Sequence, residues 1–120
     1  MAAKDEFGRA GEERAARYLA DAGWLILARN WRCREGELDL VAQRGDVLAA
    51  VEVKSRRGIG YGHPFEAITP RKLDRLRRLA VAWAIAHPDE ARGRRVRIDA
   101  IAITGDDAAT APLEHLEDVR

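Results

Sequence analysis

Two acidic residues and a lysine near the middle of the sequence, Asp39, Glu52 and Lys54, are of types that act together on phosphates. Mg²⁺ and Mn²⁺ prefer carboxylate oxygens, and proteins commonly hold such ions by one or two carboxylates together with water and a substrate phosphate. The bound cation polarises the phosphate and lowers the pKa of a bound water. A lysine beside it can orient or deprotonate the attacking water, or offset charge that develops on the phosphate. The three residues therefore indicate metal-dependent chemistry on a phosphodiester, provided that the fold brings them together.

The residues on either side of Gly45-Asp46 are expected to form a hairpin that joins these side chains. Residues 37–44 and 47–54 alternate like strands, and the dipeptide between them suits a two-residue turn. If Arg44 pairs with Val47, one face of the hairpin is wholly apolar and consists of Leu38, Leu40, Ala42, Ala49, Val51 and Val53. A shift of one residue would move charged side chains into that face, so the hydrophobic pattern favours this register.

In this register the opposite face of the hairpin ends in charged residues. Asp39 lies across from Glu52, and Glu37 lies across from Lys54. Directly opposed Cβ atoms are about 4.5–5.5 Å apart, so the two carboxylates would repel each other unless a cation lay between them. We therefore expect a divalent cation held by Asp39 and Glu52, with the carbonyl oxygen of Val53 near enough in the sequence to be a further ligand.

The same residues also have a structural interpretation. Asp39 and Glu52 could instead form ion pairs with Lys54 and Arg56 at the strand ends, and exposed pairs of that kind contribute little stability. Lys54 could likewise be only a structural partner of Glu37. If Glu37 belongs to the site, we expect it to support the site by hydrogen bonding and not to bind the metal.

Before the hairpin, hydrophobic periodicity predicts one helix and one strand. Residues 4–22 repeat apolar side chains at helical spacing, and Gly23 is suited to end that helix. Residues 24–28 form a short apolar run typical of a strand, and Asn30 is expected to mark a turn after it.

After the hairpin, the sequence predicts a second helix and a last strand. Thr69 followed by Pro70 is a typical helix start, and the helix is expected to run to Ala86. Residues 95–104 are expected to form an inner strand that is buried on both sides near its end. Residues 105–120 are acidic and are expected to be a less ordered tail of a single domain, 1–120. The predicted class is α/β, with the element order α-β-β-β-α-β.

Basic residues cluster after the hairpin and along the outer face of the second helix. Contacts from such residues to a sugar-phosphate backbone provide affinity without reading the base sequence. The residues expected to bind nucleic acid in this way are Arg56, Arg57, Arg71, Lys72, Arg75 and Arg78. Ser55 is expected either to contact a phosphate and support the site or simply to end a strand. A charged cluster is more often only solvated surface, so the charge pattern alone leaves the partner open.

Length and composition exclude several other classes of protein. A chain of 120 residues suits one domain, and 47% apolar residues are enough for a hydrophobic core. Cys33 is the only cysteine, which excludes an internal disulfide and a zinc site built on several thiolates. The apolar runs fall short of the roughly 20 residues of a membrane span, and the first residues lack the apolar segment of a secretory signal, so a cytoplasmic protein without a membrane partner is expected. The three histidines are far apart in the sequence, so no histidine metal site is expected.

Several segments resemble a known family. The spacing of Asp39 from Glu52-Val53-Lys54 resembles the PD-(D/E)xK nuclease signature, although Leu38 stands where that signature has proline. More closely, the chain resembles the YraN-type family of small bacterial proteins, which are similar to archaeal Holliday-junction resolvases. The segments that carry this resemblance are Gly11-Glu12-Glu13-Arg14-Ala15, Asn30-Trp31-Arg32, Gly36-Glu37-Leu38-Asp39-Leu40-Val41-Ala42 and Val51-Glu52-Val53-Lys54-Ser55-Arg56.

The resemblance implies a restriction-endonuclease-like fold, in which helices flank a central mixed β-sheet. It implies that Glu12 joins the metal site, a role that spacing alone leaves open because Glu13 is adjacent. It also implies an Mg²⁺- or Mn²⁺-dependent endonuclease that acts on DNA, including branched or structured DNA, and that works as a homodimer because a four-way junction presents two equivalent strands. The alternatives are a non-catalytic nucleic-acid-binding or adaptor module on the same scaffold, or a protein whose hairpin face docks a basic surface of another protein.

Overall fold

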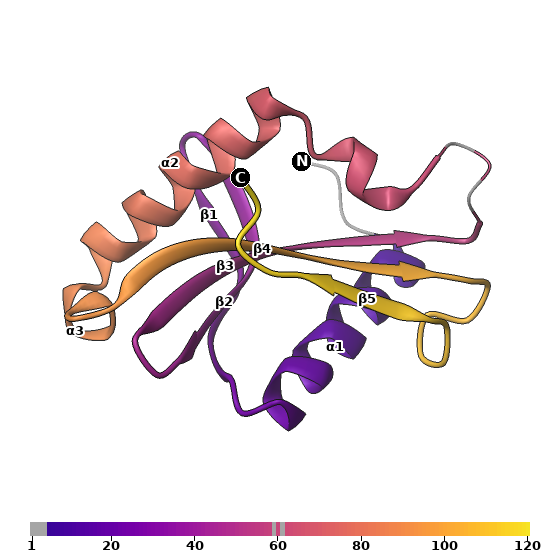
Figure 1. The fold of residues 1–120 in the computed structure, drawn as a ribbon, viewed down its shortest axis with the longest axis horizontal. Helices are drawn as coiled ribbons and strands as arrows, with labels where there is room; N and C mark the ends of the chain where they lie inside the picture. Colours follow the sequence, from indigo (N-terminus) through magenta and orange to yellow (C-terminus); the bar gives the residue numbers. More distant parts are fainter. Residues whose placement is uncertain (1–4, 59, 61) are drawn as a thin grey trace.

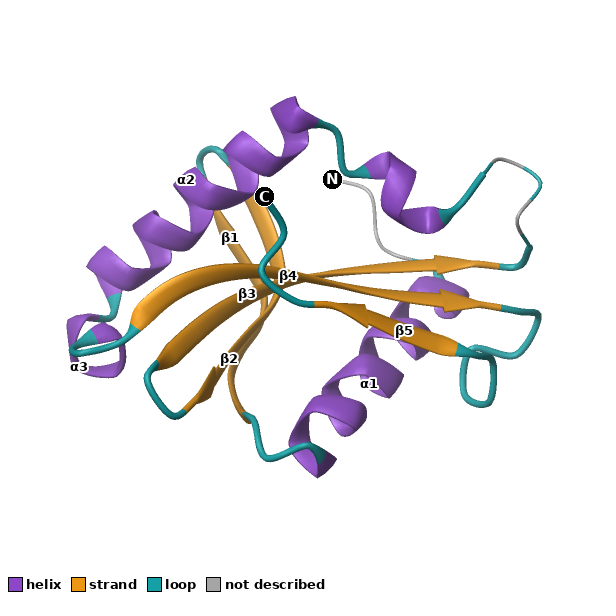
Figure 2. Cartoon of the chain, in the orientation of Figure 1, coloured by secondary structure: helices purple, strands orange, loops and turns teal. Residues whose placement is uncertain are grey.

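The computed structural model describes residues 5–58, 60 and 62–120 of the chain. Its elements are α1 (Glu6–Asp21), β1 (Leu25–Cys33), β2 (Gly36–Arg44), β3 (Val47–Arg56), a short 3₁₀ helix (Pro64–Ala67), α2 (Pro70–Ala86), α3 (Pro88–Ala91), β4 (Arg95–Thr104) and β5 (Leu113–Leu116). The strands form one sheet in the order β1-β2-β3-β4-β5, in which β3 and β4 are parallel and the other neighbours antiparallel (Figure 1). α1 packs on one face of this mixed sheet and α2 on the other (Figure 2), which is the predicted α/β arrangement.

The β2–β3 hairpin has the predicted register from Arg44 with Val47 to Leu40 with Val51. The backbone pairing stops there, so the predicted opposition of Asp39 to Glu52 and of Glu37 to Lys54 is not part of the ladder. Gly45 in the turn has a φ of 58°, a left-handed conformation that two-residue hairpin turns favour and that glycine adopts without strain. Local turn chemistry and the apolar pattern therefore agree on how the two strands align.

Each face of the sheet has its own hydrophobic core. The hairpin contributes Leu40, Ala42, Ala49, Val51 and Val53 to the α1 face, and Leu38, Val41, Leu48 and Ala50 to the α2 face. The prediction that Leu38 shares a face with Leu40 was wrong. The turn end of β1 and β2 packs against α2, where Gly36 lies next to Leu79, so Leu38 is buried by that helix instead.

β1 is longer than predicted. It begins at Leu25 and continues through Asn30 to Cys33, whereas a turn was expected at Asn30. Asn30 was expected in a turn because asparagine is common there. It does have a left-handed backbone, with a φ of 52°. Asparagine tolerates this conformation better than most residues, and the strand accommodates it without ending.

The helix ends follow from local capping. α1 begins after Asp5, whose carboxylate accepts the N–H of Gly8 at 2.7 Å, and its C-terminal end is followed by Gly23 with a φ of 92°. α2 begins after Thr69, whose Oγ1 accepts the N–H of Lys72 at 3.1 Å, and it has the predicted bounds. These caps order the first turns of both helices, and Gly8 and Lys72 in those turns lie at the candidate site.

β4 has the predicted bounds and lies inside the sheet, whereas β5 was not predicted. β5 lies within the acidic segment 105–120, and four residues offer little periodicity to recognise. Beyond β5, the N–H of Val119 donates to the carbonyl of Ile98 at 2.7 Å, so the end of the chain follows β4. Among the described residues, no helix has both the length and the apolar character needed to cross a bilayer.

Candidate active site

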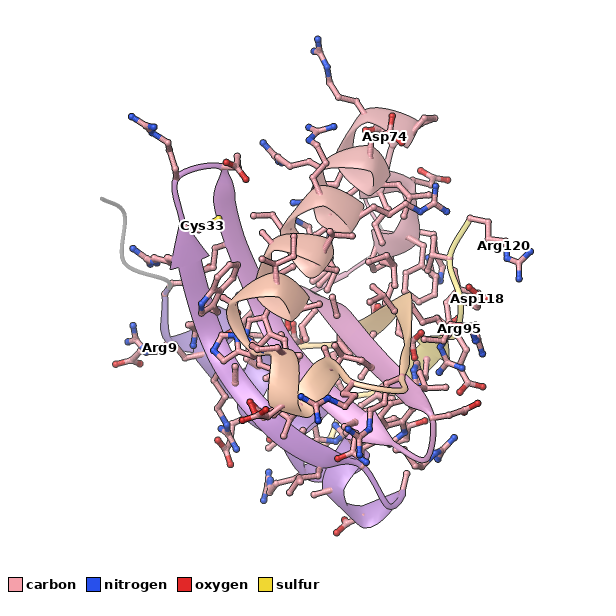
Figure 3. All side chains as sticks on the ribbon, turned by 90° about the vertical axis from the view of Figure 1, so that its left-hand side faces the viewer. Arg9, Cys33, Asp74, Arg95, Asp118 and Arg120 are labelled. Atoms are coloured by element: carbon pink, nitrogen blue, oxygen red, sulfur yellow. The ribbon has the colours of Figure 1, made fainter. Side chains whose placement is uncertain are left out.

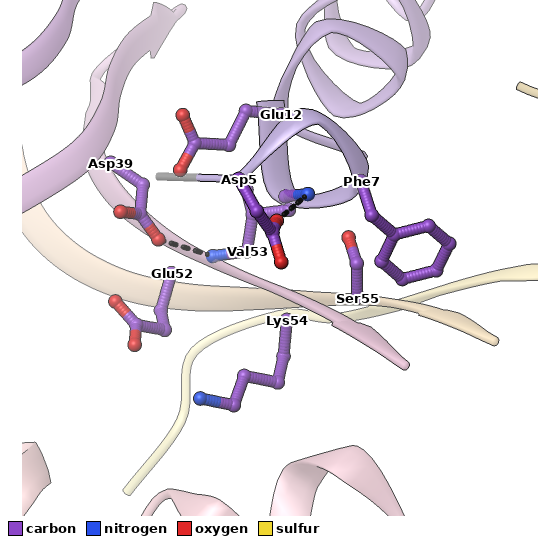
Figure 4. Close-up of a pocket in the computed structure, with 9 residues that line it drawn as sticks. Asp5, Phe7, Glu12, Asp39, Glu52, Val53, Lys54 and Ser55 are labelled. Atoms are coloured by element: carbon purple, nitrogen blue, oxygen red, sulfur yellow. Dashed lines mark hydrogen bonds between the residues drawn. The ribbon is translucent and has the colours of Figure 1, made fainter. Parts of the chain in front are cut away.

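One pocket collects the residues that were expected from the sequence to bind a metal or to act in catalysis. It lies where the first turns of α1 meet β2 and β3, and its volume is about 370 Å³. The lining residues are Asp5, Phe7, Gly8, Glu12, Asp39, Glu52, Val53, Lys54 and Ser55 (Figure 4). All four residues expected to act in catalysis are therefore on this surface.

Asp39 is held by the backbone of the neighbouring strand. It is buried, and its Oδ2 accepts the N–H of Val53 at 2.9 Å. The backbone pairing of β2 and β3 ends at Leu40 with Val51, so at the next step the carboxylate takes the place of a backbone acceptor. This contact fixes Asp39 beside the segment of β3 that carries Glu52.

Glu52 is a carboxylate in surroundings that oppose its charge. Its side chain is 11% exposed, and its Oε2 lies 3.0 Å from Nζ of Lys72. Burial, followed by the negative charge of Asp39, raises the pKa of Glu52 above its ordinary value, and Lys72 offsets only part of that rise. A divalent cation beside both carboxylates would remove this repulsion, which is the electrostatic character expected of a metal-binding pair.

Glu12 reaches the pocket because α1 approaches β3 closely at Gly11. A Cβ on Gly11 would fall on Oγ of Ser55, so only glycine permits this approach. Glu12 is 9% exposed and extends toward Asp39 (Figure 4), whereas Glu13 is half-exposed and pairs with Arg29 at 2.7 Å. The tertiary structure thus distinguishes between two glutamates that the sequence could not separate.

The chemistry of these donors fits a hard divalent cation. Glu12, Asp39 and Glu52 supply carboxylate oxygens, and the pocket lining contains neither histidine nor cysteine among the described residues. Oxygen ligands of this kind suit Mg²⁺ and Mn²⁺, which also retain bound water.

Other predicted residues lie at the margin of the pocket or outside it. Glu37 does not line the pocket and accepts a hydrogen bond from Nε of Arg32 at 2.8 Å, across the β1–β2 pair. Arg57 lies over the ring of Phe7, with Cζ 4.3 Å from the ring centroid. Nε of Arg56 is buried and has no hydrogen-bond partner in the described part of the structure. Oγ of Ser55 is likewise buried without a hydrogen-bond partner among the described residues, although Ser55 lines the pocket.

A basic hollow lies at the start of α2. It is lined by Ala67, Thr69, Arg71, Lys72, Arg75 and Arg78, which include four of the six residues expected to bind nucleic acid. The helical spacing places these basic side chains on one side of α2. Since Lys72 also bonds Glu52, the basic hollow is linked directly to the candidate active site.

A second cluster, which was not predicted from the sequence, consists of Asp99, His115 and Glu117. Their ligand atoms all lie within 4.8 Å of one another, so they form a possible metal-binding group, and among the described residues no other three meet that spacing. No histidine metal site was expected from the sequence, but Nε2 of His115 lies 2.8 Å from Asp99, so His115 does belong to such a group. The antiparallel pairing of β4 with β5 brings these residues together, and β5 itself was not predicted.

Resident side chains already neutralise this cluster. Arg97 donates two hydrogen bonds to Asp99, at 2.8 and 2.9 Å, and one to Glu117 at 3.1 Å. The hydroxyl of Tyr18 lies 3.0 Å from Nδ1 of His115. Arg97 thus supplies the positive charge that a metal would otherwise provide, which favours an ion-pair network that joins α1, β4 and β5.

The network also holds the C-terminal segment. Burial by itself would raise the pKa of Asp99, but hydrogen bonds from His115, Arg97 and the N–H of Asp118 outweigh it and keep the pKa below its ordinary value. Asp118 in turn pairs with Arg120 at 2.7 Å, at the edge of the molecule seen in Figure 3. The charged form of Asp99 is therefore the one that the fold stabilises.

The fold is a five-stranded mixed sheet with flanking helices, and an acidic pocket lies at the end of its hairpin. This fold is consistent with a restriction-endonuclease-like arrangement. A model of the uncharacterised protein family UPF0102 matches residues 11–103, and the chain belongs to this family. A UPF0102 protein of Arthrobacter sp. (strain FB24) is 51% identical over 119 residues, with 99% of each chain covered. A UPF0102 protein of Pseudarthrobacter chlorophenolicus is 50% identical over 119 residues, covering 99% of this chain and 89% of the relative. The family description names no reaction, so function has to be argued from the site.

Proposed function

We propose that this protein is a metal-dependent endonuclease that cleaves DNA phosphodiesters. The observation that carries the proposal is the partly buried Glu52 carboxylate beside the buried Asp39, with Lys54 in the same pocket. Burial and the charge of Asp39 raise the pKa of Glu52. Two such acids next to each other are unfavourable without a compensating charge. Mg²⁺ or Mn²⁺ is the compensating charge that this donor set fits.

The pocket residues divide the proposed reaction between them. Asp39 and Glu52 would hold the cation, and Glu12 and the carbonyl of Val53 are available as further ligands. When bound, the cation polarises the phosphate and provides a water of lowered pKa. Lys54 would place its ammonium group beside the reacting phosphate and offset the negative charge that develops there.

The basic hollow supports nucleic acid as the substrate. Arg71, Arg75 and Arg78 are exposed, and they lie on the same surface as Lys72, which contacts the active-site acid Glu52. The planar guanidinium groups of arginine bind phosphate oxygens well, and these contacts do not depend on the base sequence. This arrangement favours selection of DNA by its shape, including branched DNA, over selection by base sequence.

Nucleic-acid binding without cleavage is the competing function. The basic hollow alone would support it. The acidic pocket argues against it, because two adjacent carboxylates that are largely shielded from solvent weaken the fold and would repel the phosphates that a binding module must hold. A nuclease has a use for both acids and a binding module has none.

Cleavage of labelled linear, flap and four-way-junction DNA in Mg²⁺ and in Mn²⁺ tests the proposal. We expect the parent protein to cut at least one substrate, and Glu52→Gln and Lys54→Ala to lose at least about 100-fold in rate, the size of effect seen when a group that stabilises a transition state is removed. Glu35→Gln and Arg92→Ala are matched controls, because both residues are exposed and lie outside the pocket and the basic hollow. Both controls should cut at the parent rate. DNA binding by the parent without cleavage in either metal would instead support the binding module.

A further inference from the structure

The ion pair between Lys72 and Glu52 joins two surfaces with opposite charges. Lys72 comes from the basic hollow, and Glu52 comes from the acidic pocket. The distance from Nζ to Oε2 is 3.0 Å, and the two side chains are 30% and 11% exposed. At that exposure the pair is partly shielded from solvent and interacts more strongly than a surface pair.

The start of α2 determines where Lys72 can reach. The Thr69 cap holds the backbone N–H of Lys72 at 3.1 Å, so the backbone of this residue is fixed in the first helical turn. The side chain beyond Cα is a flexible four-carbon stem with a compact charge at its tip. Its ammonium group can therefore move between Glu52 and the basic hollow while the helix stays in place.

A divalent cation and the Lys72 ammonium group would compete for the same carboxylate. The carboxylates of Asp39 and Glu52 can together supply two negative charges, and the Lys72 ammonium group lies 3.0 Å from Oε2 of Glu52. A cation of charge +2 neutralises the pair more completely and leaves Lys72 without its partner. The exposed arginines of the basic hollow then repel the released ammonium group unless an anion lies among them.

We propose that Lys72 is an exchangeable counter-ion of the active site: it neutralises Glu52 in the metal-free protein, yields that carboxylate to the divalent cation, and moves to a backbone phosphate of DNA bound in the basic hollow. The inference rests on the proposed metal site. It makes Lys72 a positioning residue that couples the two binding events. Because each event favours release of Lys72 from Glu52, metal and DNA must strengthen each other's binding by the same factor.

Isothermal titration of Mg²⁺ and of Mn²⁺ into the DNA-free protein tests whether Lys72 competes with the metal for Glu52. Lys72→Met removes the competitor, so we expect the metal to bind about three- to tenfold more tightly than to the parent. Lys72→Arg retains the charge and should stay within about twofold of the parent. Arg77→Met is the matched control, because it removes one positive charge from the same helix outside the basic hollow, and it should also leave metal affinity unchanged.

DNA affinity with and without Mg²⁺ tests whether the released Lys72 binds DNA. These measurements use a Lys54→Ala background, which is expected to be unable to cleave DNA. Mg²⁺ should strengthen DNA binding in that background, and most of this gain should disappear when Lys72→Met is added. Arg77→Met in the same background should keep the gain. These readouts do not depend on turnover.

The possible failures are distinct. A parent protein that binds neither Mg²⁺ nor Mn²⁺ would overturn the proposed function and the inference with it. A parent that binds metal, with Lys72→Met binding it equally or more weakly, would overturn the inference alone and leave Lys72 as a structural ion pair. The exchange would be supported if Lys72→Met binds the metal more tightly, has a lower melting temperature than the parent without metal, and regains the parent's melting temperature when metal is added.

Discussion

At Glu52, burial and neighbouring charges act in opposite directions on one carboxylate. Burial and Asp39 raise its pKa, Lys72 lowers it, and the net direction is upward. An acid with a raised pKa is less stable in its charged form in the folded protein than in the unfolded chain. Glu52 therefore weakens the metal-free fold, which is a common property of residues kept for function.

Replacement of this residue by its neutral isostere should stabilise the metal-free protein. We expect Glu52→Gln to raise the melting temperature at pH 7 in EDTA by about 2–6 °C, which corresponds to ~1 kcal/mol for a domain of this size. The same variant should lose the rise in melting temperature that Mg²⁺ gives the parent. Differential scanning calorimetry of both proteins, with and without Mg²⁺, measures the two effects. A lower melting temperature for Glu52→Gln in EDTA would contradict this interpretation.

The pH dependence of that difference provides an internal check. Since the folded-state pKa of Glu52 lies above the unfolded value near 4.5, the native state binds more protons between the two pKa values, and the parent loses stability as the pH rises through that window. Well below pH 4.5 the acid is neutral in both states. The advantage of Glu52→Gln should therefore vanish at low pH and reach its full size above the folded-state pKa.

At the scale of elements, the contact of α1 with β3 depends on one glycine. Gly11 is buried in the middle of the helix, where glycine normally reduces stability by about 0.5–1 kcal/mol relative to alanine. Here a Cβ would overlap Oγ of Ser55 and approach its Cβ to 3.0 Å. Glycine at this position therefore lowers the helix propensity but permits a close approach of α1 to β3. This approach brings Glu12 into the pocket.

Gly11→Ala should destabilise the protein despite its better helix propensity. We expect a loss of about 1–3 kcal/mol, the usual range for overpacking a tight contact, measured by urea unfolding. Adding Ser55→Ala removes the overlapping hydroxyl and should recover part of this loss, because the two Cβ atoms remain close. An equally stable or more stable Gly11→Ala variant would show that α1 and β3 can separate at no energetic cost.

The whole molecule has a net charge of only +1, but its charges are distributed unevenly. α1 and α2 lie on opposite faces of the sheet, so the basic hollow of α2 is separated from the basic residues of α1. The end of the chain adds Glu117 beside β4, where it pairs with Arg97 at 3.1 Å. A phosphate backbone is therefore expected to bind on one side of the molecule only.

The salt dependence of DNA binding measures this asymmetry. Each phosphate contact contributes about 0.9 to the slope of log affinity against log salt for duplex DNA, so Arg75→Ala with Arg78→Ala should reduce that slope by about 2. Arg17→Ala on α1 is the matched control, since it lines a different hollow on the other side of the sheet, and its slope should equal that of the parent. Equal losses for Arg17 and for the α2 pair would mean that the contacts are not confined to α2.

The sequence by itself determined the local features that need only neighbouring residues. The apolar alternation and Gly45-Asp46 predict the hairpin register, and Thr69 with Pro70 predicts the start of α2. From that register follows the placement of Asp39 near Glu52. Two errors were also local: Asn30 has a turn-like backbone inside a strand, and β5 is too short to show a period.

Only the tertiary structure decided which distant residues meet. The approach of α1 at Gly11 brings Glu12 to the pocket, the position of α2 sets Lys72 against Glu52, and the pairing of β5 with β4 joins His115 to Asp99. Periodicity carries no information about such contacts, because it specifies which face of an element is buried and not which other element covers it. The charge balance of the candidate site depends on these contacts, and so it could be read only from the folded chain.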